Sequence, residues 1–326
     1  MFIGVLAGLT TGALWGLTFI APLAVRPLSA WDLTVVRYGI FGLASLLLMI
    51  SPRFRPGPTT HRQIVTGLLL GGFGYTAYVA FVFFAVDLAG VTIPPLIIGT
   101  TPIVMALVTN RSHHRVPWAT LAVPLVLILS GVLTVNLAAV YGAPRGDRHD
   151  VVLGALCALG SLVTWIIYAV VNKRIMDEPQ PPETLRWTGL QGIGAALGSL
   201  VMLPFTTFRT EGLAPLATPM GPSFLLWCLA MGLGGSWLAT LCWVVASRRL
   251  PLALAAQLIV GETAFGLLYG FIYEGRWPSA AETIGSALQI GGVIAAVAVF
   301  HARRHVAPGG ADLLVEAAAA SGSGGQ

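Results

Sequence analysis

Residues 2–25 read FIGVLAGLTTGALWGLTFIAPLAV, a run of 24 residues without a charged side chain. About 20 apolar residues in a helix are enough to cross the hydrocarbon core of a bilayer. A cleavable signal peptide would begin with a positively charged segment, and this stretch has none. We therefore expect it to form the first transmembrane helix.

The same pattern recurs along the chain, which is 56% hydrophobic and only 10% charged. Soluble domains carry about 25% charged residues, so this composition requires a membrane. Turn-forming or charged residues separate the apolar runs. We predict an all-α membrane protein with ten transmembrane helices, at 3–24, 31–51, 63–86, 89–109, 117–137, 151–172, 185–204, 222–247, 251–273 and 281–301.

The basic residues predict the orientation of these helices, because cytoplasmic loops are enriched in Lys and Arg. With the N-terminus inside, twelve of the 18 basic residues fall on the cytoplasmic side and five outside, while Arg37 lies within a span. We expect a multi-pass protein of the inner (plasma) membrane with both termini in the cytoplasm. The net charge of +5 is accounted for by this bias and does not indicate nucleic-acid binding.

An internal repeat is visible when the sequence is compared with itself. A shift of 150 residues places Trp15 on Trp165, and a shift of 162 places Tyr75 on Trp237. Each predicted repeat has five helices, an odd number, so the second enters the membrane from the opposite face. Such inverted repeats are a structural basis for alternating access. We expect repeats at 1–143 and 144–305, followed by a disordered cytoplasmic tail or tag remnant at 306–326.

The sequence excludes several functional classes. It contains no Walker A, HExxH or GxSxG motif, and its histidines lie outside the predicted spans or at their ends. Cys157, Cys228 and Cys242 lie in apolar runs and are read as buried hydrophobic residues. We therefore expect no catalytic residues, no metal and no cofactor.

Two charged residues lie more than five residues from either end of a predicted span, at depths where ionised groups are costly. Glu262 is near the middle of the ninth span and is a candidate for proton coupling or for binding a substrate ammonium group. The alternative is a protonated or hydrogen-bonded glutamate at a helix contact. Arg37 lies closer to the outer end of the second span, and we expect its side chain to extend to the surface. Its alternative role is to bind a substrate carboxylate.

Pairs of polar or aromatic residues three positions apart share one face of a helix. Three such pairs are candidates for the walls of a central cavity, although lipid-facing aromatic residues are also common in membrane proteins. Two glutamines within spans could bind substrate or a neighbouring helix. These candidates are Tyr75 with Tyr78, Trp165 with Tyr168, Trp237 with Thr240, and the glutamines Gln191 and Gln257.

The chain resembles the drug/metabolite transporter superfamily, in its EamA-type branch of ten-helix proteins. The resemblance rests on Ala13-Leu14-Trp15-Gly16, Arg37, Thr101-Pro102, Trp165 with Tyr168, and the stretch Tyr273 to Pro278. Residues 165–173 also resemble the YddG branch of amino-acid exporters. Trp15 and Thr101, which belong to these motifs, complete the predicted substrate-binding set. The sequence departs from the family pattern at Ala264, where proline is usual, and at 111–115.

The resemblance implies a secondary transporter that exports small metabolites, with amino acids, aromatic ones especially, as substrates. A different metabolite or drug exported by proton antiport is the alternative, and a membrane scaffold or sensor is an alternative of another class. An intramembrane enzyme is disfavoured because Glu262 has no second acid or histidine at a similar depth; the others lie at span ends or in loops. We expect a monomer, and facilitated diffusion and proton exchange both remain open.

Overall fold

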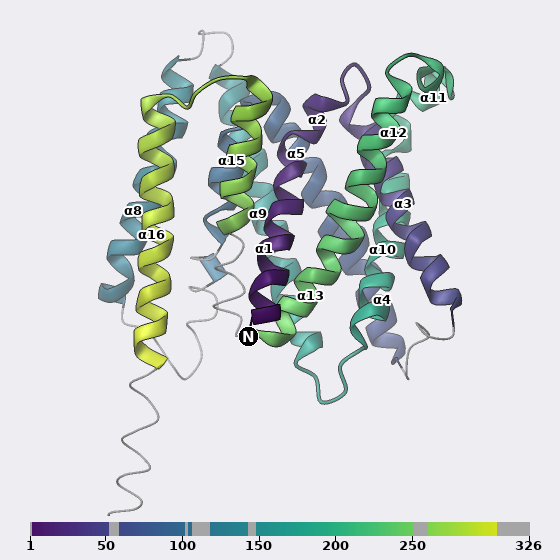
Figure 1. The fold of residues 1–326 in the computed structure, drawn as a ribbon, viewed down its shortest axis with the longest axis horizontal. Helices are drawn as coiled ribbons and strands as arrows, with labels where there is room; N and C mark the ends of the chain where they lie inside the picture. Colours follow the sequence, from purple (N-terminus) through teal and green to yellow (C-terminus); the bar gives the residue numbers. More distant parts are fainter. Residues whose placement is uncertain are drawn as a thin grey trace, which may run out of the picture.

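The computed structural model describes residues 2–51, 59–101, 104–105, 118–142, 148–250 and 260–304. Over these residues the regular structure is entirely helical, with the long helices roughly side by side (Figure 1). The end of the bundle at which α1 begins is called the N-terminal face here, and the opposite end the far face. The last turn of α16 also lies at the N-terminal face (Figure 1). The predicted tail at 306–326 lies outside the described residues.

The N-terminal part of the chain crosses the bundle repeatedly between these faces. The first predicted span consists of α1 and two short helical pieces, η1 and α2. The helices of the N-terminal part are α1 (Phe2–Gly16), η1 (Leu17–Phe19), α2 (Ala21–Ala24), α3 (Ala30–Ile50), α4 (His61–Leu69), η3 (Leu70–Tyr75), α5 (Thr76–Ala89), α6 (Ile93–Ile98) and α8 (Trp118–Gly142).

The C-terminal part adds a second set of long helices that pack against the first. Its elements are α9 (Arg148–Met176), α10 (Thr184–Ser199), η4 (Leu200–Phe205), α11 (Phe208–Glu211), η5 (Ala214–Ala217), α12 (Gly221–Leu229), η6 (Ala230–Leu238), α13 (Ala239–Arg249), α15 (Val260–Glu274) and α16 (Ala280–Arg304). Helical residues occur in all ten predicted spans.

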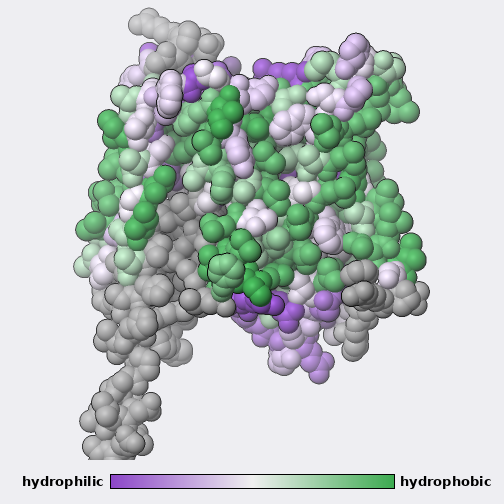
Figure 2. Space-filling model, in the orientation of Figure 1, coloured by the Kyte–Doolittle hydropathy of each residue, from purple (hydrophilic) through white to green (hydrophobic). Residues whose placement is uncertain are grey.

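The outside of the bundle is apolar over its middle, and hydrophilic residues gather toward its two ends (Figure 2). Large side chains such as Leu47, Val201 and Ile272 are exposed on it. Six described stretches are long and apolar enough to cross a membrane. The structure is therefore that of a multi-pass membrane protein. The total of ten spans stays a prediction, because the spans at 89–109 and 251–273 are only partly described.

Two helices are interrupted by π-helical segments, which the hydropathy pattern did not predict. Gly71, Gly72 and Gly74 lie in η3, between α4 and α5. In η6, between α12 and α13, Gly232, Gly234 and Gly235 lie in the corresponding place. A π-turn disturbs the regular hydrogen-bond ladder of a helix, and such segments are frequent at functional sites.

Close packing between helices depends on small residues, as is usual in membranes. A Cβ atom added to Gly71 would lie 2.0 Å from the carbonyl oxygen of Gln191, where η3 crosses α10. A Cβ on Gly131 would lie 2.4 Å from the carbonyl oxygen of Gly285, where α8 crosses α16. A side chain at either crossing would overlap the neighbouring backbone, so glycine allows the helices to approach this closely.

Candidate transport site

A small cavity lies in the interior of the bundle, enclosed by helices from both parts of the chain. It offers about 20 Å³ to the centres of water molecules, the room needed by one or two waters. The lining residues are Trp15, Thr18, Arg37, Tyr38, Gly74, Tyr75, Tyr78, Val79, Trp165 and Glu262.

Arg37 contributes a buried guanidinium group to this cavity. Its side chain is 2% exposed. The Nε–H group donates to Ser236 Oγ at 2.8 Å, and Nη2 donates to the carbonyl oxygen of Gly235 at 3.2 Å. The guanidinium carbon also lies 5.3 Å from the centre of the Tyr38 ring. The expectation that Arg37 extends to the surface was wrong, because polar groups of η6 hold its side chain inside the bundle.

Glu262 contributes a buried carboxyl group. It belongs to the first described turn of α15 and is 3% exposed. The hydroxyl of Tyr78 donates to Glu262 Oε1 at 3.1 Å. Within the described part of the chain, neither Glu262 nor Arg37 forms an ion pair. The cavity thus contains one acidic and one basic side chain that are not paired with each other.

Aromatic rings form one wall of the cavity. The rings of Trp15 and Trp165 meet edge to face with centroids 4.9 Å apart. Trp165 also stacks on Tyr168 at 4.9 Å and contacts Tyr78 at 5.9 Å. Trp243 approaches both tryptophans from α13. Such a wall offers flat apolar surfaces and ring faces that attract cations.

A layer of hydrogen-bonded side chains adjoins the cavity. The Tyr75 hydroxyl lies 2.8 Å from Thr240 Oγ1 and 3.1 Å from the Tyr168 hydroxyl. Tyr168 donates to Gln191 Oε1 at 2.8 Å, and Gln191 Nε2 donates to Asn172 Oδ1 at 3.2 Å.

Trp187 completes this layer through its Nε1–H group, which donates to Asn172 Oδ1 at 2.6 Å. Asn172 and Trp187 lie closer than Tyr168 and Gln191 to the ends of α9 and α10 at the N-terminal face. The layer therefore extends from the cavity toward that face. We call these six residues the polar layer: Tyr75, Tyr168, Asn172, Trp187, Gln191 and Thr240.

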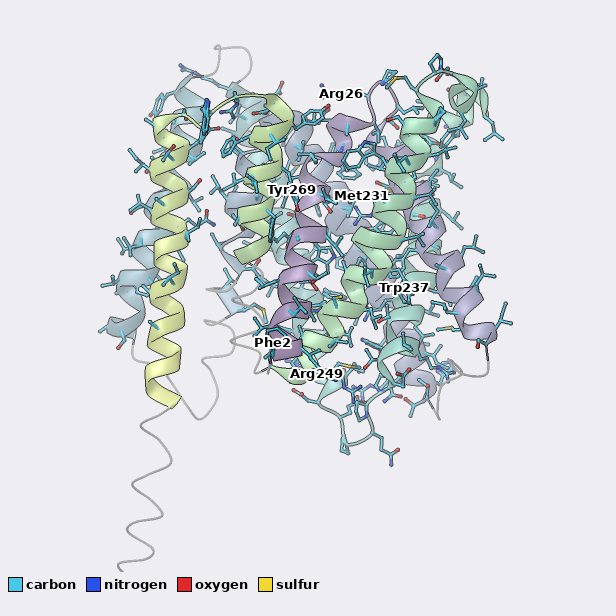
Figure 3. The ribbon with its side chains drawn as sticks, in the orientation of Figure 1. Phe2, Arg26, Met231, Trp237, Arg249 and Tyr269 are labelled. Atoms are coloured by element: carbon cyan, nitrogen blue, oxygen red, sulfur yellow. The ribbon has the colours of Figure 1, made fainter. Side chains whose placement is uncertain are left out.

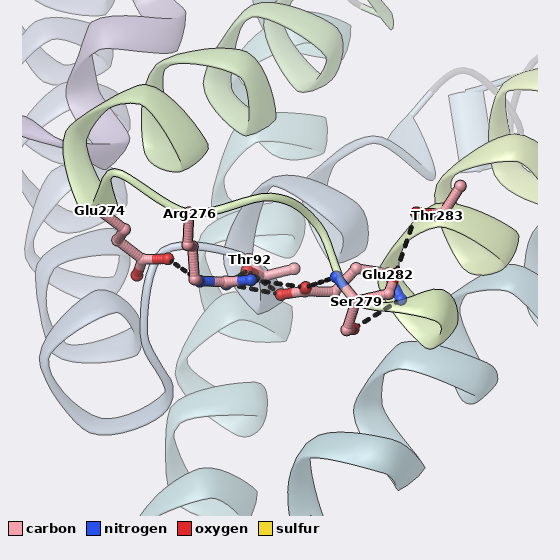
Figure 4. Close-up of polar contacts among 6 residues, drawn as sticks. All are labelled: Thr92, Glu274, Arg276, Ser279, Glu282 and Thr283. Atoms are coloured by element: carbon pink, nitrogen blue, oxygen red, sulfur yellow. Dashed lines mark hydrogen bonds and ion pairs between the residues drawn. The ribbon is translucent and has the colours of Figure 1, made fainter.

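The far face carries a second polar cluster, which we call the far-face clasp (Figure 4). Arg276 lies between α15 and α16 and donates to both carboxylate oxygens of Glu282, each at 2.7 Å. It also contacts Glu274, and Thr92 donates to Glu282 at 2.9 Å. These hydrogen bonds raise the pKa of the Arg276 guanidinium above its usual value. The clasp joins the α15–α16 connection to the segment just before α6.

Comparison with known proteins places this architecture in a family. Residues 152–298 match the EamA-like transporter family. The inner membrane protein YtfF of Escherichia coli (strain K12) is 32% identical over 306 residues, which cover 91% of this chain and 95% of the relative. The chain belongs to the EamA-like transporter family. A solved structure described as "Crystal structure of protein" shares the fold, with a TM-score of 0.63, 24% identity, and coverage of 92% of this chain and 98% of that one.

Membership of the EamA-like transporter family establishes the general activity. The chain is an inner-membrane transporter of small molecules and not an enzyme. Its multi-pass architecture agrees with the apolar helices described above. The predicted superfamily is thus confirmed, whereas the assignment to the YddG branch stays a prediction.

In this EamA-like structure the predicted site residues divide into three groups. Six line the cavity: Trp15, Arg37, Tyr75, Tyr78, Trp165 and Glu262. Three of the remainder, Tyr168, Gln191 and Thr240, belong to the polar layer. Two others, Trp237 and Thr101, are not part of the described lining, and the last is Gln257. Trp237 is half-buried in η6 (Figure 3), Thr101 donates to the carbonyl of Ile98, and Gln257 lies outside the described residues.

Sequence reasoning missed Thr18, Tyr38, Gly74 and Val79 in the lining, and Asn172 and Trp187 in the polar layer. One of these residues had a signal in the sequence, and another had none. Thr18 is three residues after Trp15, so it faces the same side of the first span. Asn172 is buried, but it lies next to Lys173 at the end of a predicted span, where an exposed polar residue is expected, so nothing in the sequence marked it.

Proposed function

We propose that this protein exports small metabolites by alternating access, with amino acids, aromatic ones especially, as its substrates. The observation that carries the proposal is the cavity, in which Arg37, Glu262 and Tyr78 face an aromatic wall deep in the bundle. Ionisable groups at such depth are retained mainly along substrate or ion pathways. Aromatic rings next to an acid and a base suit a solute that has both polar and apolar parts.

The positions of the polar layer and the far-face clasp support alternating access. The polar layer extends toward the N-terminal face, and the clasp through Arg276 lies on the far face. A transporter by alternating access opens one of these sides at a time, and a polar cluster toward each face provides contacts that could be broken separately. We infer that the N-terminal face is cytoplasmic, in keeping with the basic residues, and that the protein works as a monomer.

The two π-helical segments support the proposed inverted repeat. The shift of 162 residues, which places Gly72 on Gly234 and Tyr75 on Trp237, also superimposes η3 on η6. A π-segment is rare, so its occurrence at matching positions favours duplication over coincidence. On this basis the two halves, 1–143 and 144–305, would exchange roles as the protein changes the face to which it opens.

Counterflow in proteoliposomes tests the proposal. Vesicles containing only this protein are loaded with an unlabelled amino acid, and uptake of the labelled form is followed for a panel of amino acids, with and without a pH gradient. We expect transient accumulation of labelled aromatic amino acids. Absence of flux for the whole panel would contradict the assignment of amino acids as substrates.

Glu262 also favours a second candidate, the exchange of protons for another metabolite or drug. The same vesicles distinguish the two, because proton antiport makes uptake depend on the pH gradient. Glu262→Gln keeps the shape of the side chain and removes its charge, and we expect it to abolish such dependence. The matched control is Glu211→Gln, because Glu211 is exposed in α11 at the far face.

A further inference from the structure

Two buried hydrogen-bond donors of the cavity have no acceptor within the described part of the chain. They are Nη1 of Arg37 and Nε1 of Trp165, and both residues line the cavity. A buried donor without a partner costs free energy, and a buried cation without a partner costs more. An unpaired pair of donors, one of them charged, therefore points to an anionic acceptor that is supplied by a ligand.

The remaining contacts of Arg37 fix the direction in which this donor points. Ser236 and the Gly235 carbonyl occupy Nε and Nη2, and the Tyr38 ring lies beside the guanidinium group. Both hydrogen-bond acceptors belong to η6. Because guanidinium is planar and rigid, engagement of two of its nitrogens determines the position of the third. The hydrogen bonds to η6 thus hold the guanidinium group in one orientation and leave Nη1 available to the cavity.

The carboxyl group of Glu262, by contrast, has acceptor positions that lack hydrogen-bond donors. The Tyr78 hydroxyl is its described hydrogen-bond donor, and Glu262 is not ion-paired with Arg37. A carboxylate has about four acceptor positions, so one neutral donor leaves most of its capacity unused. A cationic donor from a ligand would satisfy it.

We propose that Arg37 and Glu262 form a zwitterion clamp. The ligand carboxylate binds Arg37 Nη1 and Trp165 Nε1, the ligand ammonium group binds Glu262, and its side chain lies along the aromatic wall. This inference rests on the proposed function and names the residues that hold each end of the substrate. A ligand that lacks either charge leaves one buried ionic group uncompensated, which is the stronger penalty.

Three ligands with the same ring test the clamp in wild-type protein. Phenylalanine has both charges, phenethylamine lacks the carboxylate, and phenylpropionate lacks the ammonium group. Each is added as a competitor to counterflow of labelled phenylalanine in proteoliposomes. We expect phenylalanine to compete at concentrations about tenfold or more below those of the other two, the effect expected when a charge-assisted contact is lost.

Variants then assign each end of the ligand. Glu262→Gln should bring phenylpropionate to within about threefold of phenylalanine and leave phenethylamine poor. Arg37→Gln should do the reverse. Ser236→Ala keeps the guanidinium group but removes the hydrogen-bond acceptor of Arg37 Nε. It should weaken the discrimination against phenethylamine and leave the discrimination against phenylpropionate unchanged. The matched controls are Arg209→Gln and Glu211→Gln at the far face, which should keep the wild-type order.

Two negative results have different meanings. If no amino acid is transported, the proposed function itself fails. If phenylalanine is transported but phenethylamine or phenylpropionate competes equally well in wild-type protein, the clamp is overturned and the transporter assignment stands. Because this comparison needs no variant, a failure of Arg37→Gln to fold does not affect it.

Discussion

Asp32, in the first turn of α3, is a buried carboxylate that links two segments of the chain through hydrogen bonds. Its Oδ2 accepts hydrogen bonds from the backbone and hydroxyl of Ser29 and from the Thr207 hydroxyl, and its Oδ1 accepts the Thr207 N–H. Asp32→Asn would turn an NH₂ group toward some of these donors. We expect the free energy of unfolding in detergent to fall by about 2 kcal/mol, as for other buried hydrogen bonds to a charged group.

Asp87→Asn is the matched control for Asp32→Asn. Asp87 pairs with Arg26 at 2.9 Å, but these side chains are 68% and 61% exposed. Exposed pairs contribute between zero and about 1 kcal/mol, so this change should have little effect. Equal losses for the two variants would show that the contacts of Asp32 add nothing beyond surface charge.

Single residues were predictable from sequence where the repeat or an isolated charge marked them. Trp15, Trp165 and Tyr75 were found through the repeat, and Glu262 through its charge within an apolar run. The partners were not predictable in the same way. Arg37 binds Ser236, which is 199 positions away. A position in a span predicts depth in the membrane, but it does not identify the polar group that faces it.

Among the elements, the crossing of η3 and α10 depends on the absence of a side chain. Gly71→Ala would place a Cβ atom 2.0 Å from the Gln191 carbonyl oxygen, a distance that only a shift of the backbone can relieve. We expect a loss of about 1–3 kcal/mol in unfolding free energy, measured in detergent by denaturant titration. Gly39→Ala in α3 is the control, because nothing lies within 4 Å of the added atom. Because alanine restricts the unfolded chain and favours helix, Gly39→Ala should be neutral or slightly stabilising. A similar loss in both variants would therefore contradict steric overlap at Gly71 as the cause.

The π-segment η3 is also held by a side chain from α3. The Tyr38 hydroxyl donates to the carbonyl oxygen of Tyr75, its last residue, at 3.1 Å. Tyr38→Phe removes this donor and should lower stability by about 1 kcal/mol. It should also increase amide hydrogen exchange in residues 70–76 specifically. Tyr273→Phe changes an exposed tyrosine and serves as control. Unchanged exchange in η3 would show that Tyr38 does not restrain this segment.

The elements were predictable to the extent that hydropathy determines them. The predicted span 31–51 corresponds to α3 at Ala30–Ile50, and 151–172 lies inside α9. Hydropathy cannot distinguish a π-turn from an α-turn, because both are built from equally apolar residues within one span. Gly71 in η3 and Gly232 in η6 lie close against neighbouring helices, and the helix type at these glycines is visible only in the structure.

At the scale of the whole molecule, one polar cluster extends toward each face of the bundle, and we propose that each closes the cavity from its own side. The polar layer is built from neutral side chains, whereas the far-face clasp is built from charges that are partly exposed. Ionic contacts near water are weaker and more sensitive to salt than buried hydrogen bonds. Opening should therefore require less free energy at the far face, and salt should lower that requirement further.

Arg276→Gln tests this asymmetry. Loss of the two-pronged contact with Glu282 should favour opening at the far face by about 1 kcal/mol, or about fivefold in population. The readout is the labelling rate of Thr18→Cys in the cavity lining by a membrane-impermeant maleimide, after Cys157, Cys228 and Cys242 are replaced by serine.

Labelling is measured in membrane vesicles of both orientations, and the increase is expected only when the reagent meets the far face. Arg209→Gln removes an exposed far-face arginine that contacts only a backbone carbonyl in the described structure, so it should leave the rate unchanged. In wild-type protein, high salt should imitate Arg276→Gln, because screening weakens the same ionic contact. Faster labelling from the N-terminal side, or an equal effect of Arg209→Gln, would mean that the clasp does not control access to the cavity.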